Sequence, residues 1–87
     1  MPFKRESMLT GTQIRIARTA LRWSAEELAS QSGVGSRTIK RIEMMAGLPS
    51  SNVSTLAKLK NSLEAAGIEF IGGPEDRPGI RIGKPRQ

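Results

Sequence analysis

The 87-residue sequence contains no cysteine and no histidine. Without cysteine, neither a disulfide framework nor thiolate ligation of a metal is available. Without histidine, the chain lacks the commonest metal ligand and the commonest general base. Glu26 and Glu27 are adjacent, but neighbouring side chains on a helix point about 100° apart, so they do not form a paired-carboxylate site. We therefore expect no enzymatic activity, no metal site and no cofactor.

Aromatic residues and long apolar runs are scarce as well. Tyrosine is absent, and the chain has one tryptophan and two phenylalanines. We expect Trp23 to wedge beneath the end of the first helix rather than to stack on nucleic-acid bases. No apolar run is long enough to span a bilayer, and no signal-peptide pattern is found. These absences favour a cytoplasmic protein that does not enter a membrane.

Positive charge is what the sequence has in excess. Fourteen lysines and arginines face eight acidic residues, which gives a formal net charge of +6. Such a balance favours a polyanionic partner, and nucleic acid is a better candidate than a membrane surface. The length allows one small domain with a modest hydrophobic core.

The most informative stretch is 24–43, which predicts two short helices joined by a tight turn. Ser24 with Glu27 three residues later is the pattern of a capping box at the first helix. Gly33 can adopt a positive φ at the break between two helices that cross steeply. Val34 follows and would fill the crossing point. This order of elements is typical of a helix-turn-helix unit.

The second helix of this unit separates apolar from basic residues. Ile39 and Ile42 fall on one side of a 3.6-residue wheel. The opposite side carries Ser36, Arg37, Lys40 and Arg41. Two arginines and a lysine would therefore face whatever this helix contacts.

A helix beginning at Thr10 or Gly11 precedes the unit, and a helix ending before Gly67 follows it. The first helix has an apolar stripe on which Arg18 is the one charged member. The residues expected to face outward are Gln13, Arg15, Thr19 and Arg22. After Gly67, the segments GIEFI and GIRIG alternate apolar and polar residues around a Gly/Pro/Asp cluster, which predicts two short strands.

Several of these residues carry a resemblance to a known family. They are Ile14, Ala17, Arg18, the segments WSAEELA, SGV, TI and RIE, and the flanking LTGTQIR and LEAAGIEF. In these positions the chain resembles the Cro-like, XRE-type family of phage and bacterial repressors. The resemblance implies a mostly α fold, a four- to five-helix Cro-like (lambda-repressor-like) helix-turn-helix domain with a short C-terminal β-hairpin or strand pair. The expected organisation is a flexible basic arm (1–8), the helix-turn-helix domain (9–66), the strands (67–83) and a disordered tail (84–87).

The resemblance also implies a function. We expect a sequence-specific regulator of transcription, a repressor, that binds a palindromic double-stranded DNA operator as a homodimer with a recognition helix (about 36–44) in the major groove. Base contacts are expected from Ser36, Arg37 and Arg41. Backbone contacts are expected from Arg15, Arg22, Ser24, Gly35, Thr38 and Lys40. A solvated basic helix face remains the alternative for these residues. Ala25 departs from the family, which usually has a glutamine there that reaches the DNA.

Three alternatives stay open. In the resembled family Arg18 pairs with the glutamate that closes the recognition helix, here Glu43; otherwise Arg18 is a surface residue. The residues expected to form the dimer interface are Leu63, Ile68, Phe70, Ile71, Ile80 and Ile82, unless the hairpin folds onto its own subunit. Finally, the same fold could serve a protein-binding regulator, such as an antitoxin or an antiactivator with a protein partner.

Overall fold

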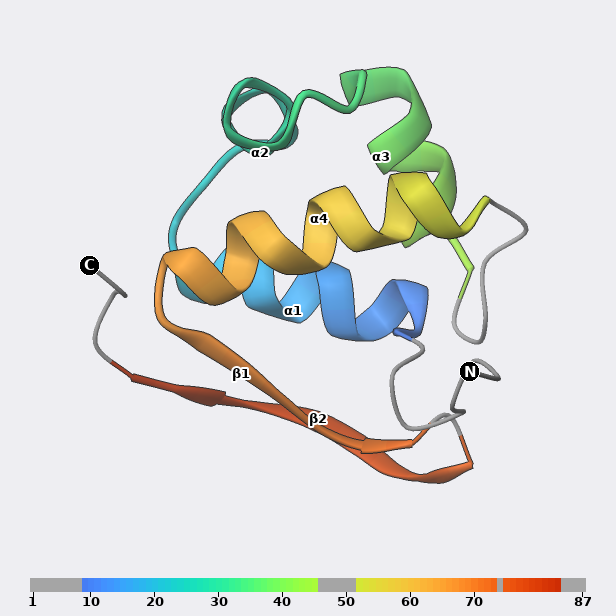
Figure 1. Ribbon diagram of the computed structural model, residues 1–87, viewed down its shortest axis with the longest axis vertical. Coiled ribbons are helices and arrows are strands. Elements are labelled where there is room, and N and C mark those ends of the chain that lie inside the picture. The colour runs from blue at the N-terminus through green and yellow to red at the C-terminus, as the bar shows by residue number, and fades with distance from the viewer. Residues whose placement is uncertain (1–8, 46–51, 74, 84–87) are drawn as a thin grey trace.

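The computed structural model describes residues 9–45, 52–73 and 75–83 (Figure 1). In this described part the chain forms four helices and one antiparallel pair of strands. They are α1 (Gly11–Ala20), α2 (Ala25–Ser32), α3 (Ser36–Glu43), α4 (Val53–Ala65), β1 (Ile68–Gly73) and β2 (Asp76–Ile82). The expected mostly helical chain with a C-terminal strand pair is confirmed at this level. The expected basic arm at 1–8 and the tail at 84–87 lie outside the described residues.

The helix starts follow local hydrogen bonding, but the reciprocal capping box is not where the sequence suggested. At α1, the Thr10 hydroxyl accepts a hydrogen bond from the Gln13 backbone N–H, and the Gln13 side-chain oxygen accepts one from the Thr10 N–H, both at 3.0 Å. At α2, the Ser24 hydroxyl accepts from the Glu27 N–H at 2.9 Å. The Glu27 carboxylate does not return this bond but accepts from Gln31 at 3.0 Å. The complete box therefore opens α1.

The end of α4 sets up the hairpin. Gly67 follows the last turn with φ of +106°, a conformation that glycine adopts without a Cβ clash. Its carbonyl oxygen accepts a hydrogen bond from the Gly83 N–H at 2.7 Å, which closes the open end of the strand pair. In the register between the strands, Ile68 lies opposite Ile82 and Phe70 opposite Ile80.

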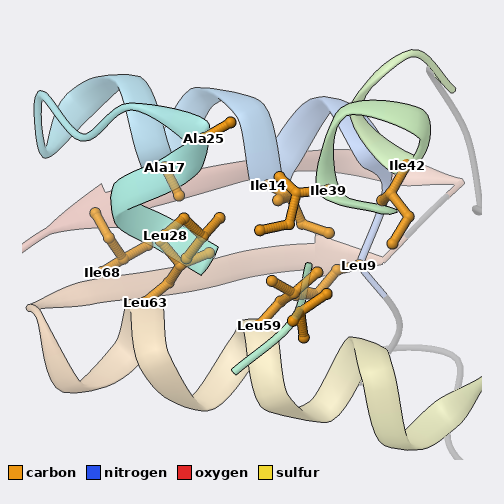
Figure 2. Packing of buried hydrophobic residues seen from close by; sticks show 11 residues of the cluster. Leu9, Ile14, Ala17, Ala25, Leu28, Ile39, Ile42, Leu59, Leu63 and Ile68 are labelled. Atoms are coloured by element: carbon orange, nitrogen blue, oxygen red, sulfur yellow. The ribbon is translucent and has the colours of Figure 1, made fainter. Parts of the chain in front are cut away.

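The molecule has three layers, with α1 and α4 in the middle (Figure 1). The α2–α3 pair lies on one side of this layer and the hairpin lies on the other. Within the hairpin, β1 contacts α4 and β2 contacts α1. The core between the layers is shown in Figure 2 and consists of Leu9, Ile14, Ala17, Ala25, Leu28, Val34, Ile39, Ile42, Leu59, Leu63 and Ile68.

One residue of α1 has the opposite orientation to that expected. Gln13 is buried rather than outward, with 1% of its surface exposed. Its side-chain nitrogen donates to the carbonyl oxygens of Ile71 at 3.2 Å and Gly79 at 3.0 Å. The hairpin covers this side of α1, so a side chain that would otherwise meet water instead bonds to both strands.

Two residues assigned to the dimer interface are also placed differently. Leu63 and Ile68 are 0% and 2% exposed and belong to the core of their own subunit. They fill the space between α4, β1 and the α2–α3 pair, so their side chains are not accessible to a second copy. Among the other assigned residues, Phe70 and Ile80 pack partly against the core, Ile71 is half-buried, and Ile82 is 65% exposed.

Candidate nucleic-acid interface

The turn between α2 and α3 fixes the angle at which α3 leaves the core. Gly33 has φ of +79°, and its N–H donates to the Ala29 carbonyl oxygen at 2.9 Å. Val34 is buried at the crossing, and its N–H donates to the Ser32 hydroxyl at 3.1 Å. Gly35 takes the N-cap position with extended backbone angles and supplies no side-chain oxygen to the helix start.

The two sides of α3 differ completely in exposure. Ile39 and Ile42 are fully buried. Arg37, Lys40 and Arg41 are exposed on the other side, and Ser36 and Thr38 are partly exposed between the two. The helix therefore presents a basic and hydroxyl-bearing surface to solvent while its apolar side anchors it to the core.

An ion pair ties the end of α3 to α1. The Arg18 guanidinium donates from Nε and Nη2 to the two carboxylate oxygens of Glu43, at 2.8 and 2.9 Å. Its Nη1 also donates to the Trp23 carbonyl oxygen at 2.8 Å. The side chains are 20% and 8% exposed, so the pair is largely removed from water. The hydrogen bond to Glu43 raises the pKa of Arg18 above its ordinary value. The pair expected from the family resemblance is thus present, in bidentate form.

A close approach of backbones fixes the same two helices at their other contact. A Cβ atom at Gly11 would overlap the carbonyl oxygens of Ile42 and Met45. The first residue of α1 therefore lies directly against the last turn of α3. Together with the Arg18–Glu43 pair, this contact leaves the C-terminal end of α3 little freedom to shift relative to α1.

The other residues expected to contact nucleic acid lie at the surface near α2 and along α1. Arg15 is exposed one turn before Arg18 on the same side of α1. Arg22 is exposed in the connection to α2 and has φ of +60°, which is uncommon for a residue with a Cβ. Ser24 is exposed, but its hydroxyl is already engaged in capping α2.

A contact that the sequence did not suggest joins α3 to the first turn of α2. The Lys40 ammonium donates to a Glu26 carboxylate oxygen at 3.1 Å. This hydrogen bond is the main reason that the pKa of Glu26 lies below its ordinary range. The two residues are on different helices, so no spacing rule for a single helix could have paired them.

Other kinds of site find no support in the part of the chain that the structure describes. There, no group of three or more His, Cys, Asp or Glu residues is arranged to hold a metal ion. Within the same residues, none of the helices has the length and apolar character needed to cross a membrane.

Comparison of the sequence with protein-family models gives no match, and comparison with curated proteins gives none either.

Proposed function

We propose that the protein is a Cro-like, XRE-type regulator that binds a specific double-stranded DNA operator, with α3 as the helix that enters the major groove. The observation that carries the proposal is the division of α3 into a fully buried apolar side and an exposed basic side. An amphipathic helix that only fills the core needs polar residues on its outer side, but not three cations within five positions. The net charge of +6 has the same sign as this surface.

In this proposal, base reading comes from the outward side of α3. Arg37 and Arg41 are one helical turn apart, so they reach successive positions along the groove. An arginine can donate two hydrogen bonds to O6 and N7 of guanine, which is the commonest specific contact in the major groove. Ser36, at the first turn, donates or accepts and is more adaptable.

Phosphate contacts position the helix without reading sequence. Gly35 supplies no capping oxygen to α3, so a phosphate oxygen can take that role at the positive end of the helix dipole. Arg22 and the start of α2 at Ser24 are candidates to hold a second phosphate, with Arg15 and Thr38 as further candidates. Lys40 can contact a phosphate only when its hydrogen bond to Glu26 is broken.

The proposal also includes a homodimer that binds a palindromic operator. By covering this operator, the dimer would act as a repressor. One subunit measures 29 × 28 × 24 Å along its principal axes. In a two-fold dimer of such subunits, the separation of the two α3 helices is twice their distance from the axis, and a subunit of this size allows the 34–36 Å between half-sites one helical turn apart. The exposed parts of the hairpin, with Ile82 the most exposed apolar side chain among them, are the surface proposed to join the two copies.

Selection of bound sequences from a random duplex pool tests this function. We expect a palindromic motif, and log K that falls linearly with log salt. Arg37→Ala and Arg41→Ala should each weaken binding to the selected site by about 1–3 kcal/mol and relax preference at one base pair. The matched control is Lys58→Ala, which removes a cation from the exposed side of α4 and should leave the motif unchanged.

The outcome that would contradict the proposal is a pool that shows no enriched motif, with all duplexes bound alike or none bound at all. If the protein then purified with a stoichiometric protein partner, the protein-binding alternative would be supported instead.

A further inference from the structure

Charges of opposite sign meet on the surface proposed to face DNA. The Lys40 ammonium and the Glu26 carboxylate are 3.1 Å apart, and their side chains are 61% and 66% exposed. Lys40 therefore has a partner before any phosphate approaches. This observation bears on how strongly the protein can bind DNA, and the inference drawn from it rests on the proposed function.

Glu26 occupies a position where a carboxylate opposes phosphate binding. It lies in the first turn of α2, next to Ser24, where the proposed function places a phosphate. An acidic residue there stabilises the helix dipole, which accounts for its presence in structural terms. It also puts a negative charge where DNA would bring another one. The preceding residue, Ala25, has no polar side chain that could bind the phosphate and so offset its repulsion by the Glu26 carboxylate.

Glu26 forms its ion pair with Lys40. The charge of Arg18 also helps to lower the pKa of Glu26, but the Arg18 guanidinium hydrogen-bonds to Glu43 and to the Trp23 carbonyl oxygen instead. The carboxylate of Glu26 is ionised at neutral pH, and its hydrogen bond with Lys40 lowers its pKa still further below the ordinary value. Lys40 and Glu26 thus form a neutral unit on an otherwise basic surface.

We propose that Glu26 limits the sequence-independent share of DNA affinity by holding Lys40 away from the phosphate backbone. Sequence-independent affinity comes mainly from cations that replace counterions on the phosphates. A lysine that remains paired with a carboxylate of its own protein replaces none. Glu26 is in this sense a positioning residue that acts through Lys40 and contacts neither base nor phosphate.

The test is Glu26→Gln, which keeps the size and polarity of the side chain and removes its charge. Binding of the full chain to a random-sequence duplex and to the selected operator is measured over a range of salt concentrations. At low salt, both DNAs should bind about twofold to fivefold more tightly per subunit, the range expected for one exposed ion pair. The slope of log K against log salt should steepen by about 0.9 per subunit, because one more phosphate is neutralised.

The chain offers a matched control in Glu64→Gln. Glu64 pairs with Lys60 at 3.6 Å within α4, so its replacement changes the net charge equally and leaves the Lys40–Glu26 pair intact. This control should change the slope by much less than Glu26→Gln. A gain in Glu26→Gln no larger than in Glu64→Gln would show that net charge alone is responsible, and would overturn the inference.

Lys40→Met in both backgrounds tests whether Glu26 acts through Lys40. In the wild type, Lys40→Met leaves the Glu26 carboxylate unpaired on the surface proposed to face DNA, so the affinity for both DNAs should fall. In the Glu26→Gln background it should abolish most of the gained affinity and the added slope. If the higher DNA affinity of Glu26→Gln persisted in full after Lys40→Met, the carboxylate would be acting on the DNA directly. That result would also overturn the inference.

The failure of the proposed function has a different signature. In that case the wild-type protein would bind no duplex, or all duplexes alike, and Arg37→Ala would change no sequence preference, so the function would fall and the inference that rests on it would fall as well. Failure of the inference alone would leave the effects of Arg37→Ala intact while Glu26→Gln matched its control.

Discussion

The buried side chain of Gln13 is the best single test of how the hairpin is attached to the helices. Gln13→Met replaces it with an apolar side chain of similar length and flexibility. The change removes two hydrogen bonds to the strand carbonyls of Ile71 and Gly79, and one from the backbone N–H of Thr10. With each bond contributing about 0.5–1.5 kcal/mol, we expect the free energy of unfolding to fall by about 2–4 kcal/mol.

Urea unfolding followed by circular dichroism measures this loss, with amide hydrogen exchange to locate it. Exchange should accelerate first in β1 and β2, since their link to α1 is broken. The matched control is Gln31→Met, in which the same substitution is made on the exposed surface of α2. That change should cost less than about 0.5 kcal/mol. Equal losses for the two substitutions would refute the structural role assigned to Gln13.

Gln13→Glu sharpens the same test through its pH dependence. A carboxylate at this position would face two carbonyl oxygens without a proton to donate, so burial should raise its pKa in the folded state. Such a carboxyl group costs the folded state least at a pH below its pKa in the unfolded chain, which is about 4.3 for glutamate. As the pH rises from there through the pKa of the group in the folded state, the free energy of unfolding falls. Relative to wild type, the variant should therefore be most destabilised at neutral pH.

Two further predictions concern the contacts that hold α3 against α1. Arg18→Met should destabilise the fold by about 3–5 kcal/mol, because it leaves both oxygens of a largely buried carboxylate unpaired. Adding Glu43→Leu should recover part of this loss. If the losses of the two single variants in urea unfolding simply added up in the double variant, the pairing would be contradicted. Gly11→Ala should cost about 1–3 kcal/mol despite the better helix propensity of alanine, because the new Cβ meets the carbonyls of Ile42 and Met45. Gly35→Ala, whose Cβ has no other atom within 4 Å, should cost clearly less, and a similar thermal shift for the two would speak against the close approach.

Local signals were sufficient to predict most of the fold. The 3.6-residue period and the caps located the helices, Gly33 marked the break between α2 and α3, and the alternating segments after Gly67 located the strands. Each of these signals acts within a few residues of chain. They are therefore readable without knowledge of the tertiary structure.

What could not be predicted depends on segments that are distant in sequence. Gln13 looks like a surface residue until the hairpin is placed over α1. Leu63 and Ile68 look like surplus apolar residues until the hairpin makes them part of the core. Lys40 and Glu26 lie on different helices and meet only because the turn at Gly33 sets the crossing angle.

The placement of the hairpin also limits how two copies could read one palindrome. If two hairpins packed face to face, the α3 helices would lie on opposite sides of the dimer, because the hairpin and α3 are on opposite sides of each subunit (Figure 1). The outer face of the hairpin also carries an exposed ion pair between Glu69 and Arg81, at 3.2 Å, which such packing would remove from water.

Edge-to-edge pairing avoids both problems. Two hairpins joined along an edge, around a two-fold axis perpendicular to the sheet, keep both helical layers on the same side of a four-stranded sheet. Pro78 has no N–H to donate, so on β2 such pairing is confined to the following residues up to Ile82. In that arrangement both α3 helices face one side of the dimer, as binding to two half-sites of one duplex requires.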